Sequence, residues 1–188
     1  MEALALLELD SIAAGFRVAD AVAKKARVDL LESRPLDPGK YLILFRGDVA
    51  SVEASFREGV ERAGERLVDR VFLPAAHESI LPLLGRTPPS YDGPIESIGV
   101  VETAAAASTV LSADAAAKTA PVRLLRVHLA RRTGGKGYFV ITGPLADVEA
   151  AVSAGAAAAR DGGKLVGEVV IPSPAAETLA KIREEWLR

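Results

Sequence analysis

The 188-residue sequence contains no cysteine, which excludes disulfide bonds, thiolate zinc sites, cysteine-bound iron–sulfur clusters and cysteine nucleophiles. Aromatic residues are scarce, because five Phe, three Tyr and one Trp are too few for a base-stacking platform. An excess of one charge is also missing, since 23 basic side chains face 25 acidic ones and the net charge is −2. We therefore expect no nucleic-acid partner and no polybasic contact with a membrane surface.

Long hydrophobic runs are absent as well. No apolar stretch approaches the ~20 residues that a membrane-spanning helix needs. The first residues, Met1-Glu2-Ala3-Leu4, lack the basic start of a signal peptide. These two observations predict a cytoplasmic protein that does not enter a membrane.

What the sequence does contain is an internal repeat. Ala19–Val28 recurs as Ala113–Val122, an offset of 94 positions. The offset grows to 96 and then to 98 along the chain, because residues 52–54 recur as 148–150 and residues 67–68 recur as 165–166. Two small insertions in loops of the second copy account for this growth. The chain is therefore a tandem duplication.

Each copy predicts the same series of elements. A short apolar strand is followed by an amphipathic helix, whose apolar residues recur at the spacing i, i+4, i+7, i+11 and i+14. Two strands around a turn, a second helix, a strand that ends at a proline and a short closing helix come next. The first helix carries this stripe at Ile12, Phe16, Ala19, Ala23 and Ala26, and the second copy carries it at Ala106, Val110, Ala113, Ala117 and Ala120. The closing helices are expected at 77–84 and 175–187.

The order β-α-β-β-α-β occurs twice, which predicts an α/β (α+β) fold of two tandem ferredoxin-like domains. The first domain is expected at 1–85 and the second at 96–188. Residues 86–95 form the expected linker, since the stretch 85–94 holds three prolines and two glycines that neither a helix nor a central strand tolerates.

No cluster of residues predicts catalysis. His77 and His128 have no second histidine or carboxylate at a metal-ligand spacing, so we expect neither a metal nor a cofactor. The loop Thr133–Gly137 superficially resembles a phosphate-binding loop, but it continues into a strand rather than a helix. Glu8 and Glu102 occupy equivalent strand positions, and we expect them to accept hydrogen bonds near a helix start. The chain is not expected to be an enzyme, and no catalytic residue is assigned.

Residues that recur in both copies resemble those of bacterial microcompartment shell domains. Two such domains in tandem, in the unpermuted element order, are similar to shell proteins whose trimers imitate a hexamer. The resemblance implies a structural protein that forms a flat tile with a central pore for metabolites, packed edge to edge with other shell proteins. It rests on Leu6-Leu7-Glu8, Ala19-Asp20-Ala21, Lys24-Lys25-Ala26, Arg46–Val49 and Val71–Pro74, and on Val100–Glu102, Ala113–Ala115, Lys118, Gly143, Val148–Ala150 and Val170–Pro172 in the second copy.

The resemblance also implies site residues. The two hairpin turns meet around the threefold axis, and Lys24 and Lys118 lie at the contact between neighbouring tiles. The expected pore-lining residues are Leu36, Asp37, Pro38, Gly39, Lys40, Arg132, Thr133, Gly134, Gly135 and Lys136.

Charge near these turns predicts which metabolites pass. Five basic residues lie in or beside the turns (Arg34, Lys40, Arg131, Arg132 and Lys136), against the single carboxylate of Asp37. A narrow opening with this surplus favours anionic metabolites. The alternative is that the basic side chains extend into solvent or pair with carboxylates from elsewhere in the fold.

One function of another class also fits the fold. Tandem ferredoxin-like domains occur in small-molecule-binding regulatory proteins, where the effector binds between the repeats. Such a sensor is a small oligomer stabilised by its ligand, whereas a shell tile forms sheets without one.

Overall fold

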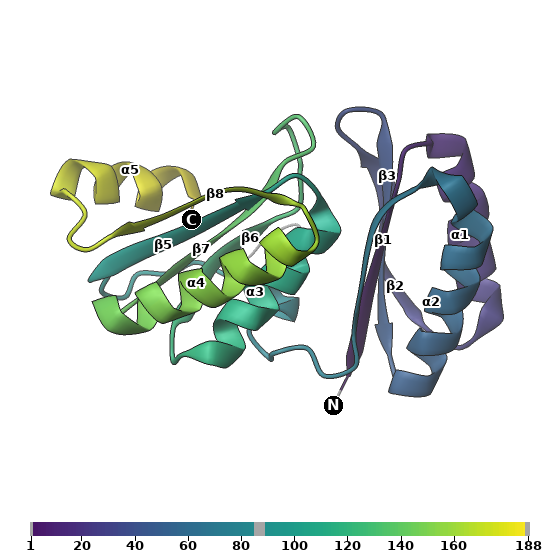
Figure 1. The fold of residues 1–188 in the computed structure, drawn as a ribbon, viewed down its shortest axis with the longest axis horizontal. Helices are drawn as coiled ribbons and strands as arrows, with labels where there is room; N and C mark the ends of the chain where they lie inside the picture. Colours follow the sequence, from purple (N-terminus) through teal and green to yellow (C-terminus); the bar gives the residue numbers. More distant parts are fainter. Residues whose placement is uncertain (1, 85–88, 187–188) are drawn as a thin grey trace.

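The computed structural model describes residues 2–84 and 89–186, which form two similar halves (Figure 1). The first half contains β1 (Ala3–Leu9), α1 (Ile12–Lys25), β2 (Asp29–Leu36), β3 (Lys40–Gly47), α2 (Val49–Ala63), the 3-10 turn η1 (Gly64–Arg66) and β4 (Leu67–Leu73). The second half contains β5 (Ser97–Thr103), α3 (Ala106–Thr119), β6 (Arg123–His128), β7 (Gly137–Gly143), α4 (Leu145–Asp161) and β8 (Leu165–Ile171). The predicted duplication is therefore a structural one.

Both sheets have the strand order of the ferredoxin-like fold. The first is ordered β2-β3-β1-β4 and the second β6-β7-β5-β8, and all neighbouring strands are antiparallel. Even the irregularities recur, because the ladder shifts between Leu30 and Glu32 in the first sheet and between Leu124 and Arg126 in the second. The predicted fold class and the unpermuted element order are confirmed.

The predicted closing helix differs between the copies. Residues 77–84 form turns and only a short 3-10 helix, η2 (Leu81–Leu83), so the helix expected over this whole range is wrong. Pro82 lies inside that segment and removes a backbone donor. The second copy does end in a helix, α5 (Ala176–Trp186). Residues 85–88, at the expected boundary between domain and linker, lie outside the described ranges.

Side-chain caps and one glycine fix the helices of the first half. The Ser11 side chain accepts from the backbone N–H of Ala14 (3.2 Å), and Asp48 accepts from Ser51 (2.9 Å), so each satisfies a donor that the helix leaves free. Gly15 permits the close approach of α1 to the sheet, since a Cβ there would lie 2.1 Å from Cγ of Tyr41. No helix among the described residues is long and apolar enough to span a membrane.

The largest hydrophobic cluster of the described residues spans both halves. Helices α1 and α2 cover one face of the first sheet, and the other face packs on α3 of the second half (Figure 1). Leu6 and Val71 of the first sheet belong to the same buried cluster as Val110 and Ala113 of α3. Helix α3 is therefore buried on two sides, between its own sheet and the sheet of the first half.

Candidate functional site

The two predicted turns lie side by side at one end of the molecule (Figure 1). Oδ2 of Asp37, in the first turn, accepts a hydrogen bond of 2.8 Å from the backbone N–H of Arg132 in the second. A Cβ on Gly135 would lie 3.0 Å from Pro38, which shows how closely the turns approach. Gly39 and Gly135 have φ angles of 75° and 90°, where glycine avoids the strain of a side chain. Residues 95 positions apart thus form one surface.

Four of the five basic side chains beside the turns are paired with carboxylates. Lys40 Nζ lies 2.7 Å from Glu8 and Lys136 Nζ lies 3.0 Å from Glu102. Arg34 and Arg131 both pair with Glu32. The surplus of positive charge per chain falls from four to one when these carboxylates are counted. These ion pairs confirm the alternative expectation for four of the basic side chains, which pair with carboxylates from elsewhere in the fold. The four are Lys40, Lys136, Arg34 and Arg131.

Glu8 does more than pair with a lysine. Its side chain is fully buried, and Oε2 accepts a hydrogen bond of 2.7 Å from the backbone N–H of Ala106 at the start of α3. The role expected of Glu8, accepting a donor near a helix start, is confirmed, although the helix belongs to the other repeat. Glu102 stands at the equivalent position, is partly exposed and pairs with Lys136.

A histidine lies just behind the second turn. The His128 ring stacks on Tyr138 with 4.8 Å between centroids, and Nε2 forms a hydrogen bond of 2.7 Å with the carbonyl of Arg131. Burial lowers the pKa of His128 below its ordinary value, and the charges of Arg126, Arg131 and Arg34 lower it further. The ring is therefore neutral at pH 7.

The two predicted tile-edge lysines have different surroundings. Lys118 Nζ donates to the carbonyl of Ala75 in the first half (2.6 Å) and pairs with Asp114 (2.6 Å). Asp114 is buried and also accepts from the backbone N–H of His77 (2.7 Å). Lys24 pairs with Asp20 on the exposed outer side of α1. Both lysines lie at the C-terminal ends of their helices, at the end of the sheets opposite the turns.

A further polar contact joins the halves. Asp69 of β4 accepts hydrogen bonds from the backbone N–H (2.9 Å) and hydroxyl (2.6 Å) of Ser108 in α3. The equivalent positions in the other copy are Gly167 and Ala14, which have no side-chain hydrogen-bonding groups. Sequence reasoning did not predict the contacts of Asp69 with Ser108 or of Asp114 with His77, because each joins one repeat to the other.

The same face of each repeat is covered in one copy and open in the other. On α3, Val110 has no exposed surface, whereas the equivalent Phe16 of α1 is 63% exposed. On the sheets, Val71 is 4% exposed against 47% for the equivalent Val169. The chain thus buries one contact, between α3 and the first sheet. The equivalent face of α1 and the equivalent face of the second sheet are left open.

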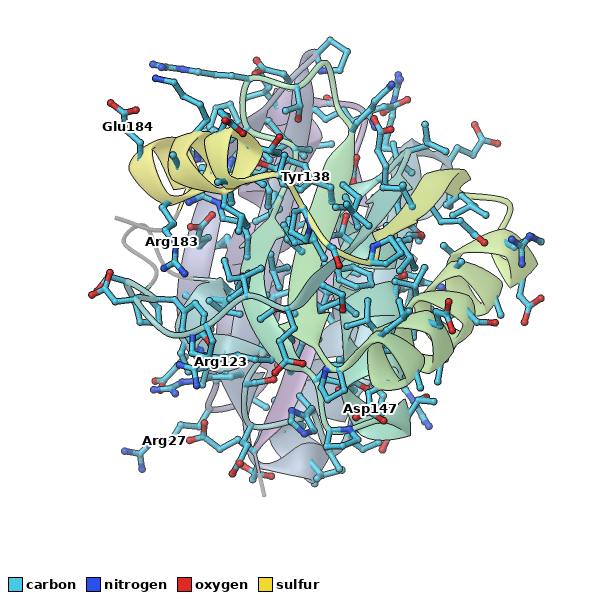
Figure 2. The ribbon with its side chains drawn as sticks, turned by 90° about the vertical axis from the view of Figure 1, so that its left-hand side faces the viewer. Arg27, Arg123, Tyr138, Asp147, Arg183 and Glu184 are labelled. Atoms are coloured by element: carbon cyan, nitrogen blue, oxygen red, sulfur yellow. The ribbon has the colours of Figure 1, made fainter. Side chains whose placement is uncertain are left out.

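The open sheet face is partly covered by its own closing helix. Figure 2 looks onto this face, with α5, the helix that carries Arg183, lying across it near Tyr138. Leu179 and Ile182 of α5 pack on a buried cluster of Ile98, Leu125 and Val140. Val169 of β8 remains exposed.

No group of three or more histidine, aspartate or glutamate side chains that could hold a metal occurs within residues 2–84 and 89–186.

Comparison with known proteins gives one consistent result. The family model of the BMC domain matches twice, at residues 3–76 and 97–174. The chain is 41% identical to the bacterial microcompartment shell protein PduT of Citrobacter freundii, over 92% of this chain and 93% of that protein. It is 29% identical to the carboxysome assembly protein CcmO of Synechococcus elongatus, over 97% of this chain and 69% of that protein. A solved microcompartment protein from Desulfitobacterium hafniense DCB superposes with a TM-score of 0.84 at 40% identity, covering 96% of this chain and 99% of that one.

Proposed function

The chain belongs to the BMC-domain family of bacterial microcompartment shell proteins, and we propose that it forms a homotrimeric tile whose six domains surround a central pore. Its place in the shell of a bacterial microcompartment follows from that membership. Its relatives are structural proteins, and in this proposal the chain itself catalyses no reaction.

The observation that carries the trimer is the unequal exposure of equivalent faces. Helix α3 packs on the first sheet within the chain, while α1 and the second sheet keep the same two faces open. If α1 of one chain packs on the second sheet of the next, every repeat makes the same contact between a helix and a sheet. A head-to-tail contact of this kind closes into a ring, and three chains supply six domains.

The side chains on the two open faces fit each other in size. Phe16 of α1 replaces the smaller Val110 of α3, while Val100 of the second sheet replaces the larger Leu6 of the first. A larger side chain on the helix therefore meets a smaller one on the sheet, which conserves the packed volume.

The polar contacts within the chain predict those between chains. By equivalence with the Glu8–Ala106 bond, the free oxygen of Glu102 accepts from the backbone N–H of Ile12 in the next chain. By equivalence with the Asp114–His77 bond, Asp20 accepts from the backbone N–H of Ala175.

The paired turns surround the pore in this arrangement, and the far ends of the sheets form the rim. The support is their position, since Asp37 and Arg132 hold the turns together at one end, and Lys24 and Lys118 lie at the opposite end. We assign the pore-lining role to 36–40 and 132–136, and lateral contacts with other shell proteins to the two lysines.

The proposed pore favours small anionic metabolites through Arg132. Within the described part of the chain this arginine has no ion-pair partner, whereas Lys40 and Lys136 are neutralised. Three copies of Arg132 around one axis leave a modest positive field, weaker than five unpaired cations per chain would give. Phosphate titrated into the trimer should bind, and Arg132→Glu should abolish that binding.

The trimer is tested by mass and by shape. Light scattering should give about 59 kDa, three times the 19.7 kDa of the chain. Electron microscopy of the purified protein should reveal hexagonal tiles in sheets without added ligand. A stable monomer or tetramer contradicts the proposal, and so does a small oligomer that forms only with an effector.

A further inference from the structure

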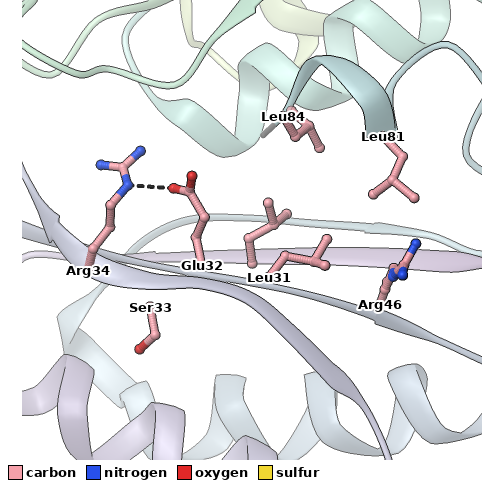
Figure 3. A pocket seen from close by; sticks show the side chains of 8 residues that line it. Leu31, Glu32, Ser33, Arg34, Arg46, Leu81 and Leu84 are labelled. Carbon is pink, nitrogen blue, oxygen red and sulfur yellow. Dashed lines mark hydrogen bonds and ion pairs between the residues drawn. The ribbon is translucent and has the colours of Figure 1, made fainter. Parts of the chain in front are cut away.

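A cavity of about 400 Å³ opens on the first sheet, on the side of β2 and β3 (Figure 3). Leu81 and Leu84 of the segment after β4 face Leu31 across it, and Leu44 of β3 is a further lining residue. Arg46 lies at one end, and the ion pair of Arg34 with Glu32 lies at the other. Helix α3 packs on the β1 and β4 side of the same sheet and does not line the cavity.

The second repeat shows the same place filled. The positions equivalent to the four leucines are Leu125, Val140, Leu179 and Ile182, and all four belong to one apolar cluster. Tyr91, from the extended segment before β5, packs against that cluster. Its ring lies 4.6 Å from the Arg123 guanidinium carbon, and its hydroxyl donates to the carbonyl of Pro94 (2.8 Å). An aromatic side chain thus packs, in one copy, on the cluster formed by the residues equivalent to the leucines that line the cavity in the other.

An arginine holds the backbone of that segment. Arg183 donates to the carbonyls of Tyr91 (3.4 Å) and Gly93 (2.6 Å). The cavity of the first repeat has its own arginine, Arg46, which donates to Glu2 through its terminal nitrogen (3.1 Å). Its Nε is buried and makes no hydrogen bond, since the nearest carboxylate oxygen, on Asp29, is 3.6 Å away. A buried donor of this kind requires an acceptor, and a peptide carbonyl is the acceptor that the second repeat uses.

We propose that this cavity is a docking site for an extended peptide segment of another polypeptide, which inserts an aromatic side chain beside Leu31, Leu81 and Leu84. Binding moves the groups that cover Arg46, so that a backbone carbonyl of the segment accepts from Nε, which has no accessible surface in the free chain. The inserted ring removes the exposed surfaces of Leu31 and Leu81 from water. A peptide-binding site of this kind adds a specific partner to a structural tile, and it does not depend on the trimer or on the pore.

The chain itself supplies the probe for the test. The peptide Pro-Ser-Tyr-Asp-Gly-Pro-Ile-Glu copies residues 89–96, the segment that fills the second site. Labelled at its N-terminus, it should bind the full-length protein saturably in fluorescence anisotropy. The same peptide with alanine in place of its tyrosine should bind about tenfold more weakly, because it loses the burial of one aromatic side chain.

Two matched variants locate the binding. Leu31→Asp places a charge in the wall of the cavity and should weaken the peptide at least about tenfold. Leu30→Asp changes a similarly exposed neighbour that does not line the cavity, and it should leave the affinity within about twofold. Both variants should keep the circular dichroism spectrum and oligomeric mass of the parent protein, because both side chains are exposed.

Three results overturn the proposal: no saturable binding to the parent protein, equal binding of the alanine peptide, or undiminished binding to Leu31→Asp. The third would mean that the peptide exchanges with residues 89–96 on the second sheet. Failure of the trimer, by contrast, would appear in the mass measurement and not in these titrations.

Discussion

Glu8 and Ala106 are 98 positions apart, yet the carboxylate of the first accepts the backbone N–H of the second at 2.7 Å. Helix α3 begins after Ala105, whose side chain offers no cap. The carboxylate of Glu8 therefore completes the first turn of a helix in the other repeat, and its negative charge lies at the positive end of the helix dipole. The start of a helix in the second repeat is thus stabilised by a residue of the first.

Replacing Glu8 by alanine should destabilise the protein by about 3 kcal/mol, because it leaves Lys40 without its buried partner and the N–H of Ala106 without an acceptor. Denaturant unfolding followed by circular dichroism measures this loss. Glu168→Ala is the control, because loss of its partly exposed pair with Arg160 should cost less than about 1 kcal/mol in folding. Equal losses in the two variants would contradict the assignment.

Phe16→Glu should convert the trimer to a folded monomer of 19.7 kDa. The charged side chain would have to be buried against the second sheet of the next chain, which costs more than the contact gains. In the monomer this position faces water, so the fold persists. Size-exclusion chromatography with light scattering measures the change.

Leu145→Glu is the control for that variant. Leu145 is 39% exposed and the equivalent Val49 is 40% exposed, so neither position is covered by the contact that the chain already contains. Light scattering should find Leu145→Glu as a trimer. A monomer from both variants would indicate that any apolar-to-acid change disrupts the assembly.

Lys24→Glu should impair the growth of sheets and leave the trimer intact. Exposed charges at a rim govern association more than folding, and an exposed ion pair contributes less than about 1 kcal/mol. Electron microscopy measures the extent of the sheets, and light scattering measures the mass of the trimer. Lys118 is less suited to this test, because it also donates to the carbonyl of Ala75 between the repeats. Sheets of normal extent from Lys24→Glu would remove this lysine from the tile edge.

Stability should fall in acid through His128. Its pKa is lowered by burial in the folded chain, so the unfolded chain binds the proton more readily. The contribution of His128 is complete above the unfolded pKa of about 6.5 and is lost as the pH falls through the lower folded value. Thermal unfolding at pH 7.5 and 5.0 measures the loss, and His128→Gln should reduce the difference. An unchanged difference in that variant would assign the acid sensitivity to other groups.

The fold was predictable because its signals are local. Strand alternation, helix spacing, the turn at 37–40 and the repeated order of elements each depend on neighbouring residues. The segment 77–84 was less accessible, since its apolar residues fit a helix while Pro82 interrupts the hydrogen bonding that a helix needs.

The partners of the site residues could not be read from the sequence. The stripe on α1 correctly predicts a helix, but Ile12 and Phe16 face outward while Val18 and Val22 face the first sheet. A helix that is apolar on two sides does not reveal which side meets its own sheet. The pairing of Lys40 and Lys136 with strand carboxylates likewise depends on sheet register.

The linker between the repeats changes how such a tile assembles. A ring of six separate domains would need six intermolecular contacts, and each contact would dissociate on dilution. Tethering makes the contact of α3 with the first sheet intramolecular, at an effective concentration on the order of millimolar, whatever the amount of protein. Only the three contacts between chains then depend on protein concentration. These three contacts lack the Asp69–Ser108 hydrogen bonds, so the tile should dissociate into intact two-domain chains.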